Sequence, residues 1–251
     1  MKIMVFDVGG TEIKYSVMDE QMHRTDSGAV PTPQDTQAQF LDTVYRLYAP
    51  HKDEVSGIAM ALPGFVDNRT GYVSNGGALL YNTATPVGQL LAEKCSCPVI
   101  LENDGKAAAM AELANGALKD CCNAAVFIIG TGVGGGVIVN GKVIDGAHGA
   151  GGEIGHITVN PHETAVCGCG KRGCLEQYSS ATGVVRCMKK LLDANPDTAC
   201  TLRGKDFEAK DVFDAARAGD ALAAREVDEM ASTLGMALAN IAATTDPEMF
   251  M

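Results

Sequence analysis

The segment from Gly151 to Glu176, GGEIGHITVNPHETAVCGCGKRGCLE, contains three cysteines with the spacing C-x-C-x4-C: Cys167, Cys169 and Cys174. His156 and His162 precede them, and glycines between them allow the backbone to turn closely around a small ion. Three thiolates at this spacing, completed by one imidazole, are typical of a tetrahedral zinc site. The alternative is that these thiols are reduced and lie close together by chance. We favour a zinc site that acts as a structural clamp beside the polar residues Glu153, His156 and Glu176.

The composition limits the kind of protein that this chain forms. It has 251 residues, of which 46% are hydrophobic and 20% charged, enough for one large or two modest globular domains. The net charge is −11 and no cluster of five or more basic residues occurs, which argues against a nucleic acid or an anionic membrane as partner. No apolar run approaches the roughly 20 residues of a membrane helix, and the apolar part of MKIMVFDVGG is too short for a signal peptide. Nine cysteines, three of them assigned to a metal, do not favour a disulfide framework and predict a cytoplasmic location.

A glycine-rich turn between two apolar strands occurs twice. Residues 3–6 are apolar and lead into Asp7-Val8-Gly9-Gly10-Thr11, and an alternating stretch with Lys14 follows. Residues 126–129 lead in the same way into Gly130-Thr131-Gly132-Val133-Gly134-Gly135-Gly136. Backbone amides in such turns can hold phosphate oxygens, with Thr11 and Lys14 as further donors and Asp7 near a metal ion. A single turn of this kind also fits an ordinary hairpin, but the repetition favours two related domains that hold one nucleotide.

The remaining pattern alternates between helices and strands. We predict helices over 35–49, from Pro86 onward, and over 107–118, 178–192 and 220–245, with strands over 55–62 and 98–101. Asn140-Gly141 is a hairpin turn signal. Residues 65–83, and the stretch between Pro196 and Gly204, are expected to be loops. The last residues, from Asp246 to Met251, resemble the beginning of an apolar strand, so we expect that the chain lacks a C-terminal part.

Glu102-Asn103-Asp104 lies between a predicted strand and a predicted helix. Ligands bind at the carboxyl ends of strands in α/β sheets, so a ligand-binding carboxylate is one interpretation of this placement. An aspartate at the start of a helix also serves as an N-cap, and capping alone is the commoner explanation of an aspartate at this position.

Together these motifs resemble the ROK family, which comprises bacterial sugar kinases, related repressors and open reading frames. The matching motifs are, in chain order, Asp7-Val8-Gly9-Gly10-Thr11-x-x-Lys14, Glu102-Asn103-Asp104, Gly130-Thr131-Gly132-x-Gly134-Gly135-Gly136, Gly152-Glu153-x-Gly155-His156 and Cys167-x-Cys169-x4-Cys174-x-Glu176. The match covers nearly the whole chain, and the cysteine motif with its trailing glutamate is its most specific part.

The resemblance implies an actin-like ATPase (ribonuclease H-like) fold, with two α/β domains over residues 1–118 and 119–251 and an active site in the cleft between them. It implies that a structural Zn²⁺ is bound by His156, Cys167, Cys169 and Cys174, and that Asp104 is the catalytic base. The implied sugar-binding residues are Gly64, Asn103, Asp104, Glu153, His156 and Glu176. The implied residues for ATP with Mg²⁺ are Asp7, Gly9, Gly10, Thr11, Lys14, Gly130, Thr131, Gly132, Gly134 and Gly135. A homodimer is the expected assembly.

The expected activity is transfer of the γ-phosphate of ATP to a hydroxyl, the 6-hydroxyl, of a glucose-like hexose. A carboxylate that accepts the proton of the hydroxyl contributes roughly 100- to 10,000-fold to the rate. The glycine turns and Mg²⁺ would supply positioning and charge neutralisation. Phe65, in the expected pocket wall, resembles the glucose or β-glucoside kinases more than the N-acetylmannosamine kinases. Two alternatives are a sugar-responsive repressor of the same family, which would carry a DNA-binding helix-turn-helix ahead of the first strand, and a non-catalytic sugar-binding protein.

Overall fold

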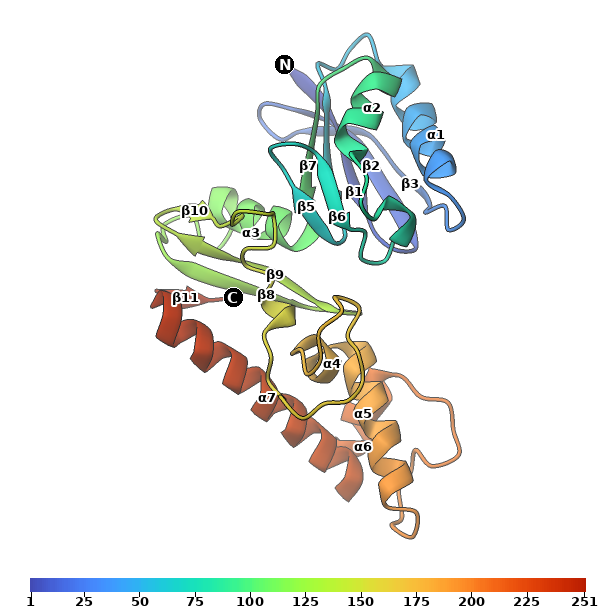
Figure 1. The fold of residues 1–251 in the computed structure, drawn as a ribbon, viewed down its shortest axis with the longest axis vertical. Helices are drawn as coiled ribbons and strands as arrows, with labels where there is room; N and C mark the ends of the chain where they lie inside the picture. The colour runs from blue at the N-terminus through green and yellow to red at the C-terminus, as the bar shows by residue number, and fades with distance from the viewer. The chain divides into compact units, whose positions relative to one another are not determined.

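The computed structural model describes residues 1–251, which divide into two compact units, each combining helices and a β-sheet (Figure 1). The first unit comprises Met1–Ala111 and Ile144–Gly152, and the second comprises Glu112–Val143 and Glu153–Met251. The predicted α/β class is confirmed. No helix has both the length and the apolar character needed to cross a membrane.

The first unit is built on a five-stranded sheet with the order β3-β2-β1-β4-β7. Its strands are β1 (Lys2–Val8), β2 (Glu12–Asp19), β3 (Arg24–Pro31), β4 (Ile58–Leu62) and β7 (Val99–Asn103). β1 pairs antiparallel with β2, while β1, β4 and β7 are parallel neighbours. The carboxyl ends of these three strands therefore lie at one edge of the sheet. Asp7, Gly64 and Asn103 lie at or just beyond this edge.

Two helices, α1 (Gln37–Tyr48) and α2 (Val87–Cys95), lie side by side against one face of this sheet (Figure 1). Their apolar side chains share one core with the strands, including Phe40 and Val44 from α1, Leu91 from α2 and Phe6 from β1. The Thr36 side chain accepts a hydrogen bond from Gln39 N and caps α1, and the short 3₁₀ turn η1 (Ala49–His51) follows it. Both predicted helices are confirmed, because their apolar residues recur at helical spacing.

The loop predicted over residues 65–83 is wrong in part. The structure has a small antiparallel hairpin here, β5 (Phe65–Asp67) and β6 (Tyr72–Asn75), followed by the 3₁₀ turn η2 (Leu80–Asn82). Each strand buries only one residue, Val66 and Val73, so the alternation is too short to be visible in the sequence. Gly64, just before β5, has a φ of +96°, and a Cβ there would lie 2.1 Å from Asn75 O, so the turn requires glycine.

The second unit contains a four-stranded sheet with the order β10-β9-β8-β11. Its strands are β8 (Ala124–Ile129), β9 (Val133–Val139), β10 (Lys142–Val143) and β11 (Met249–Phe250). The turn predicted at Asn140-Gly141 is confirmed, since both residues have a positive φ, +52° and +71°. The strand predicted to begin in the last residues is β11, which pairs parallel with β8.

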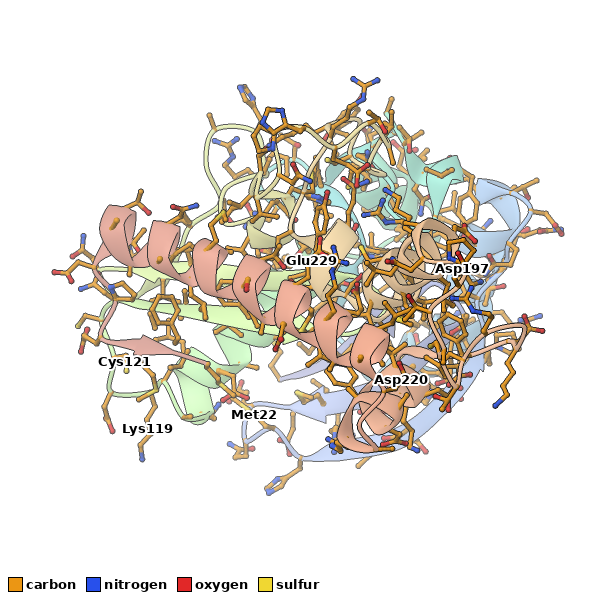
Figure 2. The ribbon with its side chains drawn as sticks, turned by 90° about the horizontal axis from the view of Figure 1, so that it is seen from below. Met22, Lys119, Cys121, Asp197, Asp220 and Glu229 are labelled. Carbon is orange, nitrogen blue, oxygen red and sulfur yellow. The ribbon has the colours of Figure 1, made fainter.

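The helices of the remaining chain are α3 (Asp104–Asn115), the 3₁₀ turn η3 (Ile154–His156), α4 (Glu176–Ser179), α5 (Ala181–Ala194), α6 (Ala209–Arg217) and α7 (Ala221–Thr245). α6 was not predicted, because it is short and buries only Val212 and Ala215. Figure 2 shows Asp220 at the N-terminal end of α7, where its Oδ1 accepts hydrogen bonds from the amides of Leu222 and Ala223.

Candidate active site

Asn103 is the last residue of β7, and Asp104 is the first residue of α3. Asn103 Oδ1 accepts a hydrogen bond from the backbone N–H of Lys106 at 3.0 Å, which is the N-cap bond of α3. Asp104 Oδ1 instead accepts hydrogen bonds from Gly105 N at 2.8 Å and from Asn103 Nδ2 at 3.1 Å. Capping is thus performed by Asn103, and it does not account for the exposed carboxylate of Asp104.

The surroundings of Asp104 make its carboxylate a stronger base. Partial removal from water is the largest cause that raises the pKa of Asp104, and the nearby charge of Asp7 raises it further. Hydrogen bonds from Gly105 and Asn103 oppose this shift in part. Since a general base works best when its pKa approaches the working pH, the shift suits proton abstraction.

The amide of Asn103 is engaged within the first unit. Asn103 is 5% exposed, and its Nδ2 donates both to Gly64 O, at 2.9 Å, and to Asp104 Oδ1. Both hydrogens of the amide are therefore used to hold the turn at Gly64 and the carboxylate of Asp104. In this conformation Asn103 orients the other two residues, and its own amide hydrogens do not point at a ligand.

Hydrogen bonds from Thr32 and Gln34 hold the backbone carbonyls of the glycine turn between β1 and β2. The carbonyl of Gly9 accepts from Thr32 Oγ1 at 2.8 Å, and that of Gly10 accepts from Gln34 Nε2 at 2.6 Å. Thr32 N donates to the next carbonyl, that of Thr11, at 2.9 Å. The side chains of Asp7, Thr11, Glu12 and Lys14 are exposed at this end of the hairpin, and Asp7 and Lys14 are directly opposite in register.

The glycine turn between β8 and β9 is held by the first two residues of α5. The carbonyl of Gly130 accepts from Ala181 N at 2.9 Å, and that of Thr131 accepts from Thr182 Oγ1 at 2.8 Å. Gly130 and Thr131 are exposed at the tip. Gly134 and Gly135 lie within β9, and a Cβ on the buried Gly135 would lie 1.9 Å from Val126 O. Gly135 therefore permits close strand pairing.

Glu176 connects this second turn to the cysteine segment. Its Oε2 accepts a hydrogen bond from Val133 N at 3.0 Å, and its Oε1 lies 3.9 Å from Cys167 Sγ. A Cβ on Gly132 would lie 2.3 Å from Glu176 Oε2. Glycine at position 132 is thus what allows the carboxylate to approach the turn so closely.

Four side chains of the second unit form a compact group of metal-ligating atoms: His156, Cys167, Cys169 and Cys174, whose ligand atoms all lie within 4.8 Å of one another. The Sγ atoms of Cys169 and Cys174 are 3.6 Å apart, and Cys167 Sγ lies 3.7 Å from Nδ1 of His156. Tetrahedral zinc with Zn–S bonds of about 2.3 Å would place neighbouring ligand atoms about 3.8 Å apart. The group therefore fits Zn²⁺ in ligand type, number and spacing.

Burial makes this group unfavourable as free thiolates. Removal from water raises the pKa of the Cys167 and Cys174 thiols, and it lowers the pKa of His156. A bound cation would reverse the effect on the thiols, because a metal ion stabilises the thiolate form.

Glu163 is a supporting residue that belongs to none of the sequence motifs. Burial alone would raise its pKa, but hydrogen bonds from Ala165 N, Tyr178, Arg186 and Lys190 lower it well below its usual range. The carboxylate, whose side chain is 5% exposed, ties the segment before the cysteines to α5 through Arg186 at 3.0 Å and Lys190 at 3.1 Å. Sequence alone offers no signal for this role, since an isolated glutamate in a polar segment is ordinarily exposed.

Comparison with known proteins gives consistent results. The model of the ROK family matches residues 3–251. A glucokinase of Halalkalibacterium halodurans is 37% identical over 96% of this chain and 76% of its own length. An N-acetyl-D-glucosamine kinase of Vibrio vulnificus is 32% identical over 97% of this chain and 80% of its own. The crystal structure of a ROK family glucokinase from Streptomyces griseus in complex with glucose and AMPPNP superposes with a TM-score of 0.79 at 32% identity, covering 100% of this chain and 82% of that one.

Proposed function

The chain belongs to the ROK family and is a sugar kinase, and we propose that it transfers the γ-phosphate of ATP to the 6-hydroxyl of a glucose-like hexose. Its fold is the actin-like ATPase fold of that family. The proposal rests on the structure at the start of α3. Asn103 makes the capping hydrogen bond of the helix, and Asp104 has an exposed carboxylate whose pKa is raised.

In the proposed reaction, Asp104 accepts the proton of the sugar hydroxyl while that oxygen attacks the γ-phosphorus. The bond between the γ-phosphorus and the bridging oxygen breaks, and ADP leaves. Asn103 holds the carboxylate in place through its 3.1 Å hydrogen bond. Gly64, Glu153, His156 and Glu176 are proposed to contact the sugar, with Nδ1 of His156 directed at the thiols and the other ring nitrogen used for the sugar.

The two glycine turns are proposed to hold the ATP phosphates, the first with Gly9, Gly10, Thr11 and Lys14 and the second with Gly130, Thr131 and Gly132. Gly134 and Gly135 support the second turn from within β9. Mg²⁺ bound with ATP would neutralise phosphate charge, and the exposed carboxylate of Asp7 is proposed to lie near it.

Zn²⁺ is proposed to have a structural role at His156, Cys167, Cys169 and Cys174. The 3.6 Å and 3.7 Å separations between ligand atoms support this assignment. Elemental analysis of the purified protein is expected to give about one zinc per chain. A protein that folds normally without zinc would contradict the assignment.

The test of the activity is ADP release measured with glucose, N-acetylglucosamine and N-acetylmannosamine in parallel. We expect sugar-dependent turnover, fastest with glucose. No ADP release with any sugar, combined with measurable sugar binding, would instead favour a sugar-sensing regulator or a non-catalytic sugar-binding protein. The kinase relatives do not favour these alternatives.

A cytoplasmic homodimer is proposed as the working state. The thiol group at Cys167, Cys169 and Cys174 requires reduced cysteines, which a reducing compartment maintains. Light scattering of the purified protein is expected to give twice the mass of one chain, and a mass of 26.1 kDa would contradict the dimer.

A further inference from the structure

Lys106, on the first turn of α3, is completely buried at 0% exposure, although lysine is one of the residue types least often found in a protein interior. Its Nζ donates a hydrogen bond to the carbonyl of Gly149 at 2.7 Å and lies 3.8 Å from Asp145 Oδ1. Burying an ammonium group costs free energy that an apolar side chain of similar length would not cost. Stability alone therefore does not explain a lysine here. Lys106 instead provides a charged hydrogen-bond donor for the backbone carbonyl of Gly149.

The carbonyl belongs to the segment 144–152, which has no helix or strand of its own and counts with the first unit. Gly149 has a φ of +75°, and a Cβ there would lie 2.2 Å from Val66 O, so its backbone is pressed against β5. Arg69 also donates to this segment, to Ala147 O at 2.8 Å, but its side chain is 61% exposed. The buried ammonium of Lys106 is therefore the better shielded of the two anchors, and shielding from water strengthens a charge-assisted hydrogen bond.

The donor Lys106 and the acceptor segment 144–152 are each close in sequence to residues of the proposed site. Lys106 follows Asp104 by two residues, and its backbone N–H is the donor that Asn103 caps. The segment 144–152 continues directly into Glu153 and then His156. We propose that Lys106 is a positioning residue for sugar binding: its ammonium fixes the backbone of 144–152, the segment from which the chain leads directly into Glu153. This inference rests on the proposed function, and it assigns Lys106 no contact with the sugar or with ATP.

The test is steady-state kinetics of Lys106→Met, which keeps an unbranched side chain only one atom shorter and removes the donor. The KM for the sugar is expected to rise about 10- to 100-fold, the loss that follows when a buried charged hydrogen bond is removed. The KM for ATP is expected to stay within about twofold, because Lys106 touches neither glycine turn. Lys119→Met is the matched control, since Lys119 is exposed and projects into solvent (Figure 2), and it should leave both KM values unchanged.

Hydrogen exchange gives a readout that does not depend on activity. In Lys106→Met, the amides of residues 147–152 are expected to exchange faster, while those of β1 and β4 keep their protection. An unchanged sugar KM would overturn the proposal. So would a parallel rise of both KM values with faster exchange throughout the first unit, since that pattern indicates a purely structural role.

A second variant decides the question if Lys106→Met does not fold. Gly149→Ala leaves the lysine in place and displaces the anchored carbonyl, because alanine is strained at a φ of +75° and its Cβ would meet Val66 O. The same selective rise in sugar KM is expected, and an unchanged sugar KM would again overturn the proposal. If the wild-type chain shows no sugar-dependent ADP release, the proposed function fails. The exchange experiment then still reports on the anchor itself.

Discussion

Asn103 and Asp104 are neighbours in the chain, but their side chains have different hydrogen-bond partners and different proposed roles. The oxygen of the Asn103 amide caps α3, and its nitrogen holds Gly64 O and Asp104 Oδ1. This leaves the second oxygen of Asp104 for a ligand. The raised pKa of Asp104 follows from the same placement, since the carboxylate is partly removed from water and shares its surroundings with Asp7.

Glu226 is a second carboxylate with an unusual environment, away from the proposed site. It lies on the buried side of α7, is 1% exposed, and its Oε2 has no hydrogen-bond partner. Burial, assisted by the charge of Glu229, raises the pKa of Glu226 to about 8, against a smaller opposing effect of Arg186. In the unfolded chain the group titrates at about 4.3. Between these two values the folded protein binds a proton that the unfolded chain does not.

The first prediction follows from this difference. The free energy of unfolding should decrease as the pH rises from about 4.3 to about 8, by at most about 1.4 kcal/mol per pH unit from this group. Glu226→Gln removes the titration, so the variant should be more stable than the wild type at pH 8 and less dependent on pH. Urea denaturation at pH 5, 6, 7 and 8 measures both. Asp228→Asn, an exposed acid on the same helix, is the control, and parallel curves for wild type and Glu226→Gln would contradict the prediction.

Among the helices, α7 depends on Asp220 at its start. Asp220 Oδ1 accepts from the amides of Leu222 and Ala223, and its Oδ2 accepts from Thr201 N and Oγ1. Burial opposes ionisation, but the hydrogen bonds from Thr201 and Ala223 outweigh it and lower the pKa of Asp220 to about 2. The Asp220 side chain thus fixes both the start of α7 and the loop between α5 and α6.

The second prediction is that Asp220→Ala destabilises the protein by about 1–2 kcal/mol, the usual cost of a lost N-cap. Thermal unfolding at pH 7 measures this. Because the folded pKa is below the unfolded value, the stabilisation by Asp220 is present above about pH 4 and is lost as the pH falls towards 2. Asp220→Asn retains a capping oxygen and should lose less. Equal losses in the two variants would mean that capping is not the source of the effect.

The cysteine segment is the element on which the second glycine turn depends. Glu176 bonds Val133 N and lies beside Cys167, so loosening the metal group should loosen the turn. The third prediction is that Cys174→Ser lowers the zinc content and the melting temperature together, and raises the KM for ATP. Cys122→Ser, at an exposed cysteine, should change none of these. A Cys174→Ser variant with full stability and normal ATP affinity would show that the segment does not support the turn.

The sequence predicts long elements well and short ones poorly. α1 and α7 carry several apolar residues at helical spacing, so their existence was predictable. β5, β6 and α6 each bury one or two residues, and Val66, Val73 and Val212 do not form a pattern by themselves. For the site, motif spacing indicates the residue types. It does not indicate that Asn103 caps α3, that Lys106 is buried, or that Glu163 is ion-paired, because these depend on contacts distant in the sequence.

The chain as a whole passes between its two units three times: within α3 after Ala111, after Val143 and after Gly152. The proposed base, the first glycine turn and the Lys106 anchor belong to the first unit. The zinc group, the second glycine turn and Glu176 belong to the second. Each unit is built on its own sheet, so a destabilising substitution in one unit should leave the fold of the other intact.

The decisive measurement is ADP release with glucose and ATP by the wild type and by Asp104→Asn, with glucose binding to each measured by calorimetry. The wild type should turn over. Asp104→Asn should lose roughly 100- to 10,000-fold in kcat, because the amide cannot accept the proton of the hydroxyl, and should still bind glucose. Turnover by Asp104→Asn at the wild-type rate would contradict the assignment of Asp104 as the base and the reaction proposed here.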